Sequence, residues 1–400
     1  MTQSRSVRPF YRRMIARRRD EPHRGATSLE LFFDLCFVVA VAQAAGNLHH
    51  DVSEGHLGHA VTSYLTVFFA IWWSWMNFTW FSSAYDTDDD VYRITTLVQI
   101  AGALIIAAGV PRAFTEADFG VITYGYVVMR LATVANWSRA AAGDPAHRSA
   151  ARRYAIGVAV VQLGWLLRLT LPEGWGTAAL PLLIVADLLV PAVAERPGMT
   201  PWHPGHIAER YGLFTLIVLG EAVLATSVAI QTGVDAGDRG LWSLAAAGLV
   251  IVFALWWLYF DRPIEAPNGL RHALIWGYGH YLIFAGIAAL GAGLVVQVDH
   301  ERHTGHISGV TAGYAVAVPL AVFLLAVWVL QVSHQQRGAV VVAFPVVAAL
   351  TLLAPLGPVP VHLIALLLFA LVTLTVLRRR RDIRQPAGPQ QTRGTSTGRP

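Results

Sequence analysis

The sequence predicts an all-α protein that crosses a membrane about twelve times, as two parallel repeats of six helices. Three observations lead to this fold class: the composition, the spacing of the apolar runs and the placement of arginine. Of the 400 residues, 55% are hydrophobic and only 14% are charged, and the mean hydropathy is +0.49. A soluble domain carries about 25% charged residues, so this chain has too little polar surface to stay in water.

The apolar runs set the number of helices. A helix that spans a bilayer needs roughly 20 mainly apolar residues. Several runs contain charges and indicate a span less strongly, notably 153–171 with Arg168 and 177–194 with Asp187. Runs of this length occur near 29–48, 60–82, 94–111, 120–140, 153–171, 177–194, 207–230, 241–260, 273–297, 308–332, 338–356 and 359–377.

The arginines predict the orientation. The 30 basic residues are all arginine, and basic residues gather in cytoplasmic loops. With both ends on one side, few arginines fall in loops on the other side: Arg112, Arg168, Arg239 and Arg302. We therefore expect a bacterial inner-membrane protein with both termini cytoplasmic, an arginine-rich tail over 1–28 and a disordered cytoplasmic tail over 378–400. The pI near 9.5 reflects this topology, so the expected partner is the lipid bilayer and not nucleic acid.

Two internal similarities indicate a duplication. FFAIWWSW (68–75) resembles VFALWWLY (252–259), and AGALIIAAG (101–109) resembles AGIAALGAG (285–293). The second segment follows the first at the same offset along the chain in both pairs. Six spans per repeat give the two halves the same orientation, as in several transporter folds. This predicts repeats over 29–195 and 206–377. The alternative is a general likeness among apolar helices.

Acidic residues within the spans are the first candidates for function, because ionisable groups at membrane depth are costly. Glu30 and Asp34 are separated by four residues, which places both carboxylates on one helical face. Glu30 is also explained by the start of the helix, where a carboxylate suits the helix dipole. Asp34 lies one turn deeper, where that explanation does not apply.

The helix predicted over 207–230 carries the second group. His206, Glu209 and Arg210 are expected at its entrance, and Glu221 lies eleven residues further, about 16 Å along the axis. We expect Arg130 to face the bundle interior as a counter-charge. Glu221 could instead be a structural acid, neutral or paired with Arg130 or Arg168. Together these residues predict a secondary transporter or a channel-like permease for an ion or small molecule, with one carboxylate set for proton coupling.

Other features predict alternative roles. The loop YDTDDD (85–90) is expected to be a solvated acidic face or, less simply, a cation site. Tryptophans 72–80 and WWLYF (256–260) fit an interfacial aromatic belt better than a ligand platform. The spacing of four outer histidines allows zinc binding, and with it a metal-dependent membrane enzyme or sensor: His56, His59, His303 and His306.

Common catalytic signatures do not occur in the sequence. Walker A, GxSxG and HExxH motifs are all missing, and Cys36 is the single cysteine, which excludes an internal disulfide. We therefore expect neither an enzyme nor a cofactor. A structural protein of stress adaptation, without transport, is the remaining alternative.

Several segments resemble the bacterial low temperature requirement A family. They are LELFFDLCFVVAVAQ (29–43), FAIWWSWMNFTWFSSAYDTDDDVYR (69–93), AGVPRAF (108–114), HIAERYGLFTLIVLGEAV (206–223) and WWLYFD (256–261). The resemblance implies a multi-pass inner-membrane protein linked to growth in the cold, and it implies no biochemical activity. The opening E-x-F-F-D pattern is also similar to the phenylalanine–serine–aspartate signature of a non-voltage-gated potassium channel family, with Phe33 in place of the serine.

Overall fold

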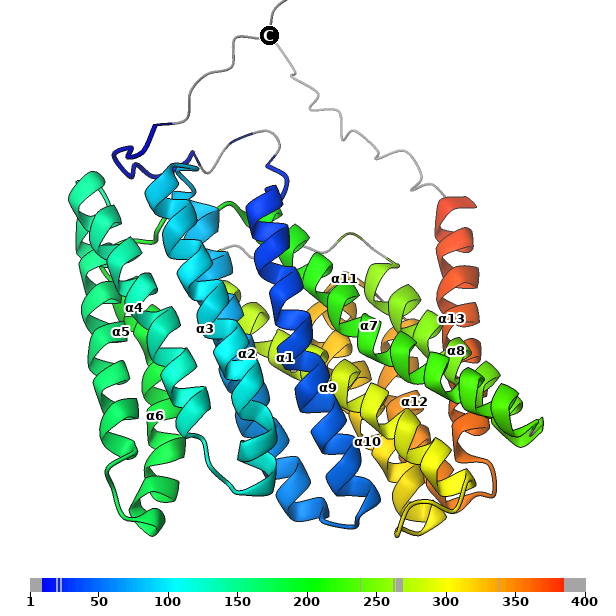
Figure 1. Cartoon of the computed structure of the whole chain (residues 1–400). Coiled ribbons are helices and arrows are strands. Elements are labelled where there is room, and N and C mark those ends of the chain that lie inside the picture. The colour runs from blue at the N-terminus through cyan, green and yellow to red at the C-terminus, as the bar shows by residue number, and fades with distance from the viewer. Residues whose placement is uncertain are drawn as a thin grey trace, which may run out of the picture.

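The computed structural model describes residues 9–18, 21, 24–237, 239–261, 263, 269–336 and 338–384. Within these ranges the chain forms a bundle of long helices (Figure 1). The last residues of α10 lead directly into a π-helical turn, η1, and α11, and α12 leads into a 3₁₀ turn, η2. The elements are α1 (Ser28–Ser53), α2 (Leu57–Tyr85), α3 (Asp90–Thr115), α4 (Gly120–Gly143), α5 (Arg148–Arg168), α6 (Glu173–Ala194), α7 (Pro204–Ala236), α8 (Arg239–Phe260), α9 (Leu270–Glu301), α10 (Gly309–Val327), η1 (Trp328–Val332), α11 (Ser333–Gln335), α12 (Ala339–Leu353), η2 (Ala354–Leu356) and α13 (Pro360–Arg384).

The described residues thus contain twelve long helices, as predicted, if α10, η1 and α11 are taken as one. Nine of these helices are long and apolar enough to cross a membrane. The other three are α2, α4 and α5; α2 is rich in aromatic and hydroxyl side chains, α4 holds Arg130 and Arg139, and α5 begins and ends with arginine. They pack beside the apolar helices in the same bundle.

Helix packing divides the bundle into two sets. In α1–α6, which we call the first half, α1 packs on α2 and α3, α3 on α4, α4 on α5, and α5 on α6. In α7–α13, the second half, α7 packs on α8 and α9, α9 on α10, α10 on α12, and α12 on α13. The halves meet where α1 packs against α7 and α9.

One end of the bundle, which we call the terminal face, carries the starts of α1 and α7 and the end of α13 (Figure 1). The segment before α1 packs across this face: Met14 is fully buried, and the backbone N–H of Arg17 donates to the carbonyl of Ala84. The predicted tail over 1–28 is therefore docked over its described residues. At the other end of the chain, helix α13 continues through Arg384, so helix replaces the disorder expected from residue 378. Residues 385–400 lie outside the described residues.

Close helix approach explains some of the small residues. A Cβ on Gly102 of α3 would lie 2.7 Å from the carbonyl oxygen of Gly125 on α4. A Cβ on Gly293 of α9 would clash still more severely with the carbonyl oxygen of Ala315 on α10. Membrane helices use small residues in this way to bring their backbones together.

Candidate functional site

A buried ion pair joins the two halves near the terminal face. Asp34 on α1 and Arg210 on α7 are both fully buried. The guanidinium of Arg210 donates to both carboxylate oxygens of Asp34, through Nη2 at 2.5 Å and Nε at 3.1 Å. The indole N–H of Trp75 on α2 donates to the same carboxylate at 2.7 Å. Bidentate geometry of this kind makes a strong, directional pair.

Glu30 extends this pair by one helical turn. Its Oε1 lies 3.1 Å from Nη1 of Arg210 and 3.3 Å from Nε2 of His206. Its position is set locally by a capping box: the backbone N–H of Thr27 donates to Glu30 at 2.8 Å, and the hydroxyl of Thr27 accepts from the N–H of Glu30. Glu30 therefore lies at the helix start, as the structural explanation expected, and it also contacts Arg210 and His206.

Arg24 covers the pair from the terminal face. It is 5% exposed and donates to the carbonyl oxygens of Ser82 and Ser83 at the end of α2. Its Nη2 also lies 3.9 Å from both Glu30 and Asp86. Arg24 thereby connects the docked segment before α1 to α1 and to the α2–α3 loop.

Asp86 differs from Glu30 and Asp34 because it lies in a loop, the one between α2 and α3. Burial, reinforced by the negative charge of Glu30, raises the pKa of Asp86 to about 6, although Arg24 and Arg17 act in the opposite direction. The expectation of a solvated acidic face over 85–90 is wrong for two of its members. The side chain of Asp86 is 5% exposed, and Asp89 is fully buried, caps α3 and pairs with Arg139 at 2.7 Å.

We call these six residues the terminal ion cluster: Arg24, Glu30, Asp34, Asp86, His206 and Arg210. Its core is charge-balanced, since Arg24 and Arg210 face Glu30 and Asp34. Removing one member of a buried ion pair leaves a charge without compensation, which is strongly unfavourable. A proton or cation that bound to Asp34 or Glu30 would thus weaken the contact between α1 and α7. The arrangement can couple ion occupancy to the packing of the two halves.

Glu209 and Glu221 lie outside this cluster. Glu209 accepts a hydrogen bond from the backbone N–H of Ala26 at 3.2 Å, in an exposed position. Glu221 is half-buried and lies eleven residues beyond Arg210 on α7, about 16 Å along the helix axis. The backbone of Glu221 packs against Gly291 of α9.

Arg130 forms a second buried ion pair, entirely within the first half. Its Nη2 lies 2.6 Å from Asp187 of α6, and the hydroxyl of Tyr126 and the indole N–H of Trp165 also donate to Asp187. The expected inward position of Arg130 is confirmed. The alternative in which Arg130 or Arg168 pairs with Glu221 is wrong, because Arg130 is taken by Asp187 and Arg168 donates to the carbonyl of Gly176.

The outer histidines lie at the face opposite the terminal face, and two of the four have side-chain hydrogen bonds. His59 lies 2.5 Å from the carbonyl oxygen of Phe114, and His306 lies 3.1 Å from Glu54. His56 precedes α2 without capping it through its side chain, and His303 is exposed. Within the described ranges, no three His, Cys, Asp or Glu side chains come together as a metal site would need.

The tryptophans of α2 are inside the bundle. Trp72, Trp73 and Trp75 are at most 2% exposed, so the expected interfacial belt is wrong for this run. Trp256 and Trp257 of α8 are 46% and 39% exposed, as a belt requires. The difference arises because α2 is enclosed by both halves, whereas α8 packs chiefly on α7 and α13.

Sequence reasoning missed three residues of the site: Arg24, Asp86 and Trp75. Arg24 was one of many tail arginines, and Asp86 one of four loop aspartates, so neither stood out by type. The indole of Trp75 was assigned to a lipid interface. The signal that could have separated Arg24 was its position just before the predicted helix start at residue 29, six residues from Glu30.

Comparison with known proteins places the chain. It is 28% identical to an uncharacterized protein, RA0937, of Rhizobium meliloti (strain 1021) over 305 aligned residues. The alignment covers 69% of this chain and 70% of that protein. No solved structure matches it. The model of the bacterial low temperature requirement A protein family matches residues 25–377, a range that contains the terminal ion cluster except Arg24. The chain therefore belongs to the bacterial low temperature requirement A family of multi-pass membrane proteins.

Proposed function

We propose that this protein is a secondary transporter or channel-like permease of the bacterial inner membrane, and that the terminal ion cluster is its gate. One observation carries the proposal: a fully buried, charge-balanced ion pair, Asp34–Arg210, lies where the two halves meet. Intramembrane charges with a named partner at an interface between halves are typical of ion and substrate pathways.

The halves themselves are proposed to be parallel repeats. Helix α1 ends at Ser53 and α7 at Ala236, while α6 begins at Glu173 and α13 at Pro360. Both spacings are close to the offset between the similar sequence segments, which start at Phe68 and Val252. The neighbour relations α1–α2, α1–α3 and α3–α4 also recur as α7–α8, α7–α9 and α9–α10.

The terminal face is proposed to be cytoplasmic. The helix ends on the opposite face carry few arginines, whereas the segment before α1 and the end of α13 are rich in them. Basic residues are retained on the cytoplasmic side during insertion. The gate would then close the pathway on the cytoplasmic side.

A purely structural role is the second candidate. Every side chain of the Asp34–Arg210–Glu30 core is paired and buried, which a static link between α1 and α7 would also need. A protein of cold adaptation without transport could use the cluster in this way. No group of metal ligands among the described residues supports the metal-dependent alternative, and we propose no enzymatic activity.

Flux into proteoliposomes separates the two candidates. Purified protein is reconstituted, and uptake of protons, Na⁺, K⁺ and small organic ions is measured under an ion gradient. The permease predicts protein-dependent flux that changes at least tenfold in Asp34→Asn and changes in Glu221→Gln. Arg168→Gln, whose guanidinium donates to a backbone carbonyl, is the matched control. If no ion moves, or if Asp34→Asn and Glu221→Gln both match the wild type, the permease proposal fails.

A further inference from the structure

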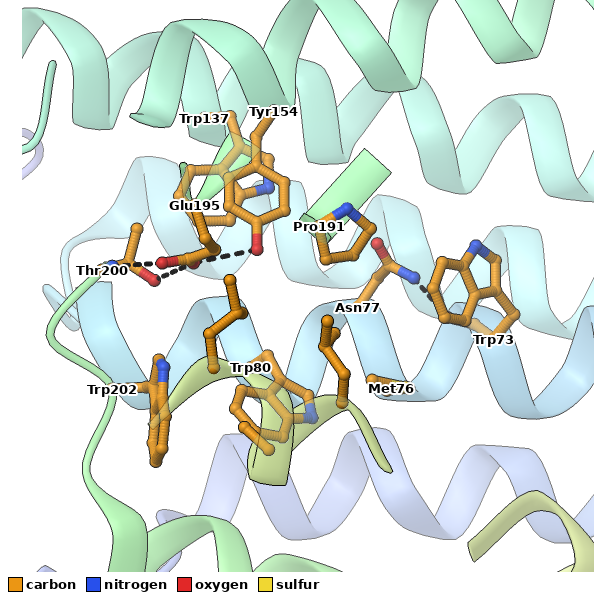
Figure 2. Close-up of a pocket in the computed structure, with 13 residues that line it drawn as sticks. Trp73, Met76, Asn77, Trp80, Trp137, Tyr154, Pro191, Glu195, Thr200 and Trp202 are labelled. Atoms are coloured by element: carbon orange, nitrogen blue, oxygen red, sulfur yellow. Dashed lines mark hydrogen bonds between the residues drawn. The ribbon is translucent and has the colours of Figure 1, made fainter. Parts of the chain in front are cut away.

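A cavity near the terminal face is lined by aromatic rings and one carboxylate (Figure 2). It lies between α2, the α4–α6 side of the first half and the start of α9, apart from the terminal ion cluster. We call it the aromatic pocket, after six of its lining residues: Trp73, Trp80, Trp137, Tyr154, Glu195 and Trp202. Among the described lining residues, Glu195 bears the only formal charge.

Glu195 is held in place but not neutralised. It is 5% exposed and accepts hydrogen bonds from the hydroxyl of Tyr154 at 2.9 Å and from the N–H and hydroxyl of Thr200, both at 2.6 Å. A carboxylate has about four acceptor positions, so about one is left for a ligand. His147, which acts on Glu195 electrostatically, already pairs with Asp144.

Burial makes the charged form of Glu195 costly. It raises the pKa of Glu195, and the hydrogen bonds from Thr200 and Tyr154 oppose this shift. Within the described part of the chain, Glu195 forms no ion pair. A cation in the pocket would supply the missing counter-charge and stabilise the carboxylate.

The rings offer the second half of a cation site. Trp137 and Tyr154 stack with centroids 4.1 Å apart, and Trp80 meets Trp202 edge-on at 4.9 Å. Figure 2 shows the first pair on one side of Glu195 and the second pair on the other. The faces of tryptophan and tyrosine attract cations, and aromatic cages of this kind bind ammonium groups. The amide nitrogen of Asn77 donates to the carbonyl of Trp73 at 2.7 Å, which leaves the amide oxygen as a further acceptor.

We propose that the aromatic pocket binds a small organic cation, a methylammonium- or guanidinium-sized ion, with Glu195 as counter-charge and the tryptophans as cation–π partners. The size follows from the cavity volume of about 40 Å³. A water molecule needs roughly 10–15 Å³ measured in this way, so the pocket holds about three or four heavy atoms. At about −1.5 kcal/mol per heavy atom, the tightest Kd is roughly 0.05 mM for the four heavy atoms of guanidinium and roughly 6 mM for the two of methylammonium. This binding does not rest on the proposed transport.

Isothermal titration of the purified full-length protein in nanodiscs tests the proposal. The probes are guanidinium and methylammonium chloride, with urea as the neutral isostere of guanidinium and NaCl as the ionic-strength control. We expect the two organic cations to bind with submillimolar to millimolar Kd and urea not to bind. Glu195→Gln should weaken binding at least about tenfold, since it removes the charge-assisted contact.

A second variant keeps the carboxylate and fills the space. Ala273 of α9 is a buried lining residue, and Ala273→Leu should abolish binding while Glu195 stays in place. Glu116→Gln, an exposed acid on the opposite face, should bind as the wild type does. Equal binding of urea and guanidinium, unchanged binding in Glu195→Gln, or a pocket that binds no probe and holds only water would each overturn the proposal. None of these results depends on whether flux is found.

Discussion

Replacement of Arg210 by glutamine should be among the most destabilising changes in this chain. Arg210 contacts Asp34 at 2.5 Å and Glu30 at 3.1 Å, and all three side chains are at most 1% exposed. Without the guanidinium, the two buried carboxylates keep Trp75, His206 and the backbone N–H of Thr27 as partners, and the only nearby arginine is Arg24, 3.9 Å from Glu30, among the described residues. Breaking a buried pair from one side costs about 3–5 kcal/mol of unfolding free energy.

Substitution of the acid, Asp34→Asn, should lower the unfolding free energy less than Arg210→Gln does. The difference between these two losses is the sharper test. In Asp34→Asn, Arg210 retains Glu30 as a counter-charge, and the amide can still accept from Trp75. We expect a loss of about 1–3 kcal/mol. The double variant should cost less than the sum of the single variants, with a coupling energy of about 0.5–3 kcal/mol.

Unfolding by sodium dodecyl sulfate in mixed micelles, followed by circular dichroism, measures these differences. Arg168→Gln is the matched arginine control, because Arg168 forms no ion pair among the described residues: it donates to a backbone carbonyl and lies over the Phe119 ring, and its loss should cost about 1 kcal/mol. If the single-variant costs of Arg210→Gln and Asp34→Asn simply add, or if Arg210→Gln is no worse than Arg168→Gln, the pair does not hold α1 against α7.

Three further outcomes follow from other contacts. Because the folded pKa of Asp86 is about 6, against an ordinary 3.8, the folded state binds its proton more tightly; stability should fall by about 2 kcal/mol as pH rises from 4 to 6, and Asp86→Asn should flatten this slope in thermal unfolding scans. Asp187→Asn leaves the buried Arg130 without its counter-charge. It should lower the unfolding free energy by about 3–5 kcal/mol, measured as a lower midpoint in the same micelle titration. Gly293→Ala places a methyl against the carbonyl oxygen of Ala315 and should cost about 1–3 kcal/mol by forcing α9 away from α10, measured in that titration too.

Each of these changes has a control of the same chemistry. Asp88→Asn removes a half-exposed loop acid paired with Arg93 and is the matched control for Asp86→Asn. Asp118→Asn removes a partly exposed acid paired with Arg112, so it should stay nearer the wild type than Asp187→Asn does. A Cβ on Gly46 meets nothing within 4 Å, which makes Gly46→Ala the neutral partner of Gly293→Ala. A control that matches its test variant would contradict the corresponding contact.

Hydropathy predicted the helices well because each span must be apolar along its own length, which is a local property. Helix ends were less accurate: α1 runs to Ser53 and α9 to Glu301, past the apolar runs, since helices continue beyond the hydrocarbon region into polar surroundings. The docking of the described residues before α1 could not be predicted in this way. It depends on carbonyls at the end of α2 and on a slot at Gly143 that receives Met14, and both arise only in the folded bundle.

The candidate site was predicted in part for the same reason. Glu30, Asp34, His206 and Arg210 stood out because charges in apolar helices are rare and costly, and the structure brings these four together. The sequence does not predict which of these charges pair with each other, because pairing depends on how the helices pack. Arg130 was a possible partner for Glu221. It instead pairs with Asp187, which lies on α6 of the same half.

The distance between α1 and α7 near the terminal ion cluster is the most direct test of the gate. Spin labels at Leu31 and Leu216, both exposed on the bundle surface, in a Cys36→Ser background, report this distance by double electron–electron resonance in nanodiscs. The gate predicts a second, longer distance in Asp34→Asn that is rare in the wild type at neutral pH. A single unchanged distance in both proteins, across acidic and neutral pH, would show that the cluster is a static link and would contradict the account.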